Sequence, residues 1–199
     1  MSDKVKFWFD PSCPWAWVTS RWILEASKMK DIEIQWEIFS LGALNEDKDL
    51  NPEYRERVNK TWGPVRVLIS AKNKYGPEVL LPLYNALGEL FHPGAKPVAK
   101  ETVALALANA KLDESLINEY ENTDLDDQLR ESTKAGLALV GDEVGTPIIA
   151  INDVAFFGPV ITSAPKGEAA LNLWNGIFAV ASFPDFYELK RTRKARPQF

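Results

Sequence analysis

An α/β fold, in which a β-α-β unit and a β-β-α unit are separated by a helical segment, is predicted by three features of the sequence. Two short segments near the N-terminus alternate in the manner of strands, and a helix-like segment lies between them. The range 44–140 then has helical patterning without a strand signal. A second β region begins near residue 145 and is followed by a further helix.

The N-terminal unit begins with a strand predicted over 5–9, which Asp10-Pro11-Ser12 ends. Apolar residues then recur at intervals of three or four, which is typical of a helix with one buried face. Pro14 fits the first turn of that helix, where a backbone N–H has no partner. A strand with one polar face is predicted over 32–38, and the two strands should be parallel.

Caps and breakers predict the elements of the following block. Asn51-Pro52 begins a helix, Gly63-Pro64 breaks or kinks it, and a run from about Pro77 ends at His92-Pro93-Gly94. Further helices are expected over 98–110, 114–121 and 124–140.

The C-terminal unit opens at Gly145-Thr146-Pro147. Strands are predicted over 148–151 and 154–157 as a hairpin, with helices over 167–181 and 183–193. This order is that of a thioredoxin fold with an all-helical insertion. We therefore expect a thioredoxin-like domain formed by 1–43 and 141–199, and an insertion subdomain over 44–140.

The composition and charge argue against a nucleic-acid-binding or membrane protein. A net charge of −5 and a pI near 5.1 give no general attraction to nucleic acid or anionic lipid, and no run approaches the length of a membrane span. The N-terminus leads directly into a strand instead of a signal segment, which predicts a cytoplasmic protein. The basic run over 190–196 is interpreted as a solvated tail.

Cys13 is the only cysteine, so no intrachain disulfide exists, and the sequence predicts no metal site. Its predicted place at a helix N-terminus favours the thiolate, typically lowering the thiol pKa from about 8.5 to roughly 3.5–7.5. A small buried apolar residue is the alternative role for a lone cysteine. The glycines do not form a Gly-x-Gly-x-x-Gly motif, so the sequence predicts no dinucleotide-binding site.

The segment Ser12-Cys13-Pro14-Trp15-Ala16 resembles the Cys-Pro-Trp-Cys site of DsbA-like thioredoxin-fold proteins, with Ala16 in place of the second cysteine. Without a resolving thiol at position 16, only an external thiol can release a mixed disulfide from Cys13. The sequence leaves open whether Ala16 is a natural monothiol variant or a substitution that traps this intermediate.

Separated motifs extend this resemblance over nearly the whole chain, to the actinobacterial mycothiol-dependent nitroreductases. They are Phe7-Trp8-Phe9-Asp10-Pro11, Thr19-Ser20-Arg21-Trp22-Ile23-Leu24, Trp62-Gly63-Pro64-Val65-Arg66, Val144-Gly145-Thr146-Pro147, Ala155-Phe156-Phe157-Gly158-Pro159 and 186–193. The resemblance implies mycothiol as a thiol cosubstrate, no tightly bound cofactor, and a small disulfide or nitro compound as substrate. Disulfide-bearing proteins are further candidate partners, and a homodimer is left open.

The same resemblance implies the site around Cys13. It implies a cis peptide bond at Thr146-Pro147 facing the cysteine, and it places Trp15, Asn45 and Tyr54 near the thiol together with Pro14. Asn45 fits equally a turn or cap, and the two aromatic residues fit equally the core. His92, at a predicted helix C-terminus that favours the imidazolium, is a further candidate acid or base and equally a structural residue.

Two other functions remain open. Kappa-class glutathione transferases and chromene-carboxylate isomerases share this architecture and use a serine near the position of Cys13, although Ser12 is out of register. A binding or chaperone module with an incidental cysteine is the non-enzymatic alternative, and the rate of Cys13 alkylation would distinguish it.

Overall fold

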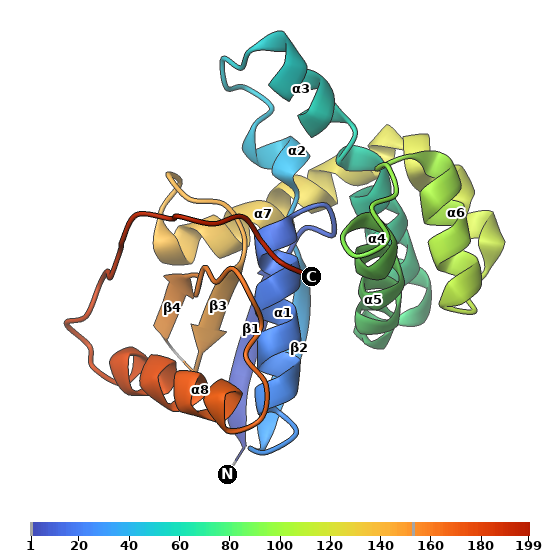
Figure 1. Ribbon diagram of the computed structural model, residues 1–199. Coiled ribbons are helices and arrows are strands. Elements are labelled where there is room, and N and C mark those ends of the chain that lie inside the picture. Colours follow the sequence, from blue (N-terminus) through green and yellow to red (C-terminus); the bar gives the residue numbers. More distant parts are fainter. Residues whose placement is uncertain (1, 153) are drawn as a thin grey trace.

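The computed structural model describes residues 2–152 and 154–199 and has a mixed α/β architecture (Figure 1). A four-stranded sheet lies beside a group of helices. The elements are β1 (Asp3–Phe9), α1 (Pro14–Ala26), β2 (Ile32–Ile38), α2 (Leu41–Leu44), α3 (Pro52–Asn59), α4 (Trp62–Tyr75), the 3₁₀ turn η1 (Pro77–Val79), α5 (Leu80–Phe91), α6 (Lys100–Asn109), the 3₁₀ segments η2 (Glu114–Glu121) and η3 (Thr123–Leu125), α7 (Asp126–Val140), β3 (Ile148–Ile151), β4 (Val154–Phe157) and α8 (Glu168–Ala181).

The sheet has the strand order β2-β1-β3-β4, and this confirms the predicted α/β fold. β1 pairs in parallel with β2, as predicted, and antiparallel with β3, which pairs antiparallel with β4. At the centre, Phe7 lies opposite both Trp36 and Ile149. Val5, Phe7 and Phe9 of β1 are buried on one face of the sheet, whereas Lys4 and Lys6 on the other face are exposed.

Helices cover both faces of the sheet. α1 and α8 pack together on one face, where the indole N–H of Trp22 donates to the carbonyl of Ala170 over 3.0 Å. α7 packs on the other face, where Leu137 contacts a buried cluster that includes Trp8 and Phe39. The predicted division into 1–43 with 141–199 and 44–140 stays a prediction, and α7 contacts the sheet although the range 44–140 includes it.

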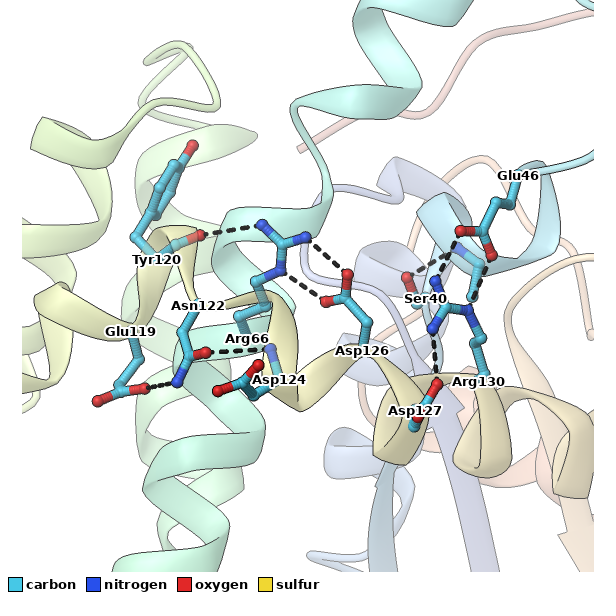
Figure 2. Close-up of polar contacts among 11 residues, drawn as sticks. Ser40, Glu46, Arg66, Glu119, Tyr120, Asn122, Asp124, Asp126, Asp127 and Arg130 are labelled. Carbon is cyan, nitrogen blue, oxygen red and sulfur yellow. Dashed lines mark hydrogen bonds and ion pairs between the residues drawn. The ribbon is translucent and has the colours of Figure 1, made fainter.

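Ion pairs join the start of α7 to α4 and to the turn after α2 (Figure 2). The guanidinium of Arg66 on α4 donates to both carboxylate oxygens of Asp126, over 2.7 and 2.8 Å. Arg130 donates to both oxygens of Glu46 over 2.9 and 2.7 Å. α7 is thus fixed both to the sheet and to the inserted helices.

Three predicted elements differ in the structure. Gly63-Pro64 lies in the first turn of a separate helix, α4, instead of interrupting one, because a proline is tolerated there. The segment 114–121 is a 3₁₀ helix. The predicted helix over 183–193 is wrong, since this segment has no regular structure. Pro184 disfavours the helical conformation at its start, and Leu189 is 82% exposed, so no apolar face is buried to stabilise a helix.

None of the helices within the described ranges is long and apolar enough to cross a membrane.

Candidate active site

Cys13 lies at the N-terminal end of α1, where the sequence predicts it. Its backbone N–H donates to the carbonyl of Asp10 over 3.0 Å, which closes the turn after β1. Its sulfur caps the helix, because the N–H of Ala16 donates to Sγ over 3.5 Å. Pro14 is the first helical residue. The sulfur is thus held against the free N–H groups of the helix.

A second loop faces the sulfur from the other half of the fold. The carbonyl oxygen of Thr146 lies 3.4 Å from Cys13 Sγ, and the Thr146–Pro147 peptide bond is cis. The Thr146 hydroxyl donates to the carbonyl of Trp8 over 2.6 Å, and the Pro147 carbonyl accepts from the N–H of Gly158 over 2.8 Å. The fold therefore brings together a cysteine and a threonine 133 positions apart.

The protonation state of Cys13 differs from the sequence prediction. The residue is 5% exposed, and burial raises the pKa of its thiol to about 12, although the N–H of Ala16 acts in the opposite direction. The predicted lowering of this pKa is wrong for the described conformation, because the loss of solvation outweighs the helix N-terminus. The neutral thiol here donates to the Thr146 carbonyl.

Asp10 is a candidate residue that the sequence analysis missed. Its side chain is fully buried, one oxygen accepts from the N–H of Ser12, and the other accepts from the N–H of Leu41, each over 2.8 Å. It thereby joins the turn after β1 to the first residue of α2. Burial raises the pKa of Asp10 to about 7, and its charge contributes to the raised pKa of Cys13. Its signals in the sequence are its place in the motif over 7–11 and its position directly after an apolar strand, a pattern that equally marks a strand end.

The remaining motif residues lie on the first turn of α1. Pro14 and Trp15 are half-buried, whereas Ala16 is fully buried. The guanidinium carbon of Arg193, from the C-terminal segment, lies 5.1 Å from the centre of the Trp15 ring. Position 16 therefore faces the interior, and Trp15 lies at the margin of the site.

Asn45 and Tyr54 are placed differently from each other. Asn45 follows α2 and is buried, and its amide donates over 2.8 Å to the carbonyl of Leu41, the residue whose N–H donates to Asp10. Tyr54 is exposed near the start of α3. Among the described residues, neither makes a hydrogen bond to Cys13, so their predicted role at the thiol stays a prediction.

His92 ends α5 and contacts the turn before Cys13. Its Nε2 lies 2.9 Å from the carbonyl oxygen of Pro11, and its ring centre lies 5.7 Å from that of Trp17. Burial lowers the pKa of His92 to about 4, despite the Pro11 carbonyl. The imidazolium expected at a helix C-terminus is therefore not favoured at pH 7, because desolvation outweighs the helix dipole. A neutral ring donates to Pro11 as a structural contact.

Within residues 2–152 and 154–199, no three His, Cys, Asp or Glu side chains gather as metal ligands would. The polar groups around Cys13 that the structure describes are backbone amides, hydroxyls and single ionisable groups.

The arrangement of sheet, inserted helices and helix-capping cysteine defines a class, the DsbA-like thioredoxin-fold proteins. The structure resembles that of the probable DsbA oxidoreductase SCO1869 from Streptomyces coelicolor, with a TM-score of 0.62 and 14% identity over 96% of this chain and 94% of that one. It also resembles a 2-hydroxychromene-2-carboxylate isomerase, with a TM-score of 0.58 and 12% identity over 88% and 94% of the two chains. Both likenesses establish the fold.

Within this class the family is defined by sequence. Residues 12–191 match the model of the Rv2466c-like family, described as mycothiol-dependent nitroreductase Rv2466c, so the chain belongs to that family. A relative in Mycobacterium tuberculosis, the uncharacterized protein Rv2286c, is 29% identical over 193 residues, which are 95% of this chain and 82% of the relative. The predicted resemblance is thereby confirmed at the level of the family.

Proposed function

We propose that this protein is a cytoplasmic thiol-disulfide oxidoreductase and nitroreductase that uses mycothiol as its thiol cosubstrate and reacts through Cys13. Family membership supports the choice of mycothiol. The observation that carries the proposal is the position of Cys13 Sγ, at the N-terminus of α1 and 3.4 Å from the Thr146 carbonyl. The backbone at Thr146-Pro147 would lie beside any disulfide that meets the sulfur.

The proposed reaction begins when the Cys13 thiol loses its proton to solvent. The thiolate attacks one sulfur of oxidised mycothiol, a new S–S bond forms on Cys13, and one mycothiol leaves as the thiolate. With a nitro compound, two mycothiol thiols give up two electrons and two protons and end as a disulfide. The nitro group takes them up and becomes a nitroso group, and one of its oxygens leaves as water. Because Ala16 carries no thiol, an external thiol must release the Cys13 adduct.

Protonation governs the rate of the first step. Since burial raises the pKa of the Cys13 thiol to about 12, the thiolate fraction should rise about tenfold for each pH unit between 7 and 10. We therefore expect adduct formation to be slow at pH 7 and to follow that slope. A rate that is flat over this range would show that the thiol ionises before substrate arrives.

The test is the intact mass of the protein after incubation with oxidised mycothiol under non-reducing conditions. We expect one mycothiol per chain, retained after removal of the reagent. In Ala16→Cys the introduced thiol should displace the mycothiol and form an intrachain disulfide with Cys13, which leaves the chain two hydrogen masses below its reduced form. Cys13→Ser is the control that must stay unmodified, and an unmodified wild-type chain would contradict the mechanism.

A thiol-orienting isomerase or transferase is the second candidate function. The observation in its favour is that the neutral Cys13 thiol donates to the Thr146 carbonyl, as a serine hydroxyl at this position would. Cys13→Ser distinguishes the two functions. An isomerase or transferase should keep much of its activity in this variant, whereas the oxidoreductase should lose it.

A further inference from the structure

Residues 183–199 form a segment that we call the C-terminal strap. Figure 1 shows it leaving the end of α8, passing the edge of the sheet beside β4 and ending near α1. The ring of Phe186 lies 5.8 Å from that of Phe156 on β4. Near its end, the N–H of Gln198 donates to the carbonyl of Thr162 over 2.7 Å. The strap therefore has a defined course across the sheet domain.

The strap reaches both sides of the turn that carries Cys13. On one side, Arg193 lies over the ring of Trp15, and Trp15 is two residues after the cysteine. On the other, the ring of Phe199 lies 5.2 Å from that of His92, which contacts the carbonyl of Pro11, two residues before the cysteine. The last seven residues of the chain therefore extend along the margin of the candidate active site.

The charge of the strap is opposite to that of the rest of the molecule. The strap holds five of the 23 basic residues, all in 190–199, and two of the 28 acidic residues, Asp185 and Glu188, so its formal charge is +3 against −8 for the rest of the chain. The five are Lys190, Arg191, Arg193, Lys194 and Arg196. No ion pair within residues 2–152 and 154–199 involves any of them. The body does not neutralise the strap, and its positive charge is available to a ligand.

We propose that the C-terminal strap forms the anion-binding part of the substrate site and selects disulfides or electrophiles that carry a carboxylate or a similar anionic group close to the reacting atom. Arg193 is the residue that contacts the ligand, because a guanidinium donates two parallel hydrogen bonds to a carboxylate. The other cations raise the local concentration of anions against the repulsion of an acidic body. This inference rests on the proposed reaction of Cys13 and specifies its substrate class.

The test compares two disulfide reagents that differ in charge. Dithiobis(nitrobenzoate) carries two carboxylates, whereas dithiodipyridine is neutral at pH 8, and Cys13 is the only thiol that either can modify. In each reaction the Cys13 sulfur bonds to one reagent sulfur, the reagent S–S bond breaks, and a coloured thiol product leaves with the electron pair. The rate with the anionic reagent divided by the rate with the neutral reagent measures the selection for negative charge. Because the burial of Cys13 slows both reactions alike, it does not change this ratio.

Two variants with equal net charge separate the strap from the overall charge. The strap variant replaces its cations by glutamine: Lys190→Gln, Arg191→Gln, Arg193→Gln, Lys194→Gln and Arg196→Gln. The control variant replaces five exposed lysines elsewhere that form no ion pair among the described residues: Lys4→Gln, Lys6→Gln, Lys111→Gln, Lys134→Gln and Lys166→Gln. Both variants keep the chain length and the ring of Phe199.

We expect the strap variant to lower the rate ratio about 10-fold and the control variant to lower it less than about 2-fold, because local charge acts within about 10 Å at 0.1 M salt. Arg193→Gln alone should account for the largest part of the loss. An equal ratio in wild type and strap variant, or equal losses in the two variants, would overturn the inference while leaving the proposed function intact. If Cys13 in the folded wild type reacts with neither reagent, the proposed function and the inference both fail.

Discussion

The turn that holds Cys13 and the C-terminal strap that borders it differ in how they treat charge. In the turn and at His92, which contacts it, burial shifts the pKa of three ionisable groups toward the neutral form: Cys13 to about 12, Asp10 to about 7 and His92 to about 4. The strap is exposed, and it carries five cations without an ion pair among the described residues. The turn therefore holds the Cys13 sulfur among neutral groups, whereas the attraction that we propose for an anionic substrate comes from a separate part of the chain.

The largest expected effect is the loss of the sulfur itself. Cys13→Ser should reduce the rate of disulfide exchange by about 10³-fold or more, because a serine hydroxyl is not ionised at neutral pH and forms no stable bond to a disulfide sulfur. The measurement is release of coloured thiol from dithiodipyridine, with circular dichroism to show that the variant is folded. Ser12→Ala is the matched control and should retain the reaction. If the Cys13→Ser variant still releases coloured thiol at the wild-type rate, Cys13 is not the group that reacts with the disulfide.

The pH dependence of stability tests whether the turn is neutral. The raised pKa of Asp10 stabilises the fold below pH 4 and loses that contribution as the pH rises to about 7, whereas the lowered pKa of His92 costs stability as the pH falls from about 6.5 to 4. Each contribution is about 2–4 kcal/mol.

Asp10→Asn and His92→Gln should therefore change the slope of unfolding free energy against pH in opposite directions between pH 4 and 7. Urea unfolding at several pH values measures both slopes, with the exposed Asp142→Asn as control. Slopes that match wild type in both variants would show that the two groups ionise as in the unfolded chain. Below pH 4, where both side chains are neutral, Asp10→Asn should also lose about 1–3 kcal/mol, since an amide has one acceptor for two backbone N–H groups.

Packing behind the turn gives a smaller effect. A Cβ on Gly88 of α5 would lie 2.1 Å from Cζ3 of Trp17, which is buried on α1. Gly88→Ala should therefore destabilise the fold by about 1–3 kcal/mol, because the indole ring must move. Gly176→Ala, at an exposed position of α8, meets no atom within 4 Å and should stabilise by up to about 1 kcal/mol. A stable Gly88→Ala variant would mean that the inserted helices do not fix the position of α1.

The sequence predicted the parts of this molecule that local patterning determines. The strands at 5–9 and 32–38 and the helix between them are visible because their apolar residues follow a strand or helix period, and the structure confirms them. The degree of burial of Cys13 depends on side chains from distant segments, so no local pattern predicts it. The conformation of 183–193 was predicted wrongly, because helix-like composition was not supported by packing against the body.

The candidate site residues also divide into those that a local pattern predicts and those that depend on contacts between distant segments. Cys13 could be placed from its turn and helix alone, whereas the Thr146–Pro147 pair was predicted through a family resemblance. Asp10 could not be distinguished from an ordinary strand end, because its role in joining two segments depends on the N–H of Leu41, which begins α2.

The smallest expected effect concerns how firmly the strap is attached. The Phe199 ring contacts His92 and is 58% exposed, and such an aromatic pair contributes about 0.5–1 kcal/mol. Phe199→Ala should therefore increase the rate of tryptic cleavage after Arg193 and Lys194 by roughly 2- to 5-fold, since cleavage follows the fraction of open strap. Phe183→Ala, at a similarly exposed position of 59%, is the control and should leave the rate unchanged. Equal cleavage of wild type and Phe199→Ala would mean that the contact with His92 does not hold the strap beside Cys13, and the contrast between turn and strap would then rest on Arg193 alone.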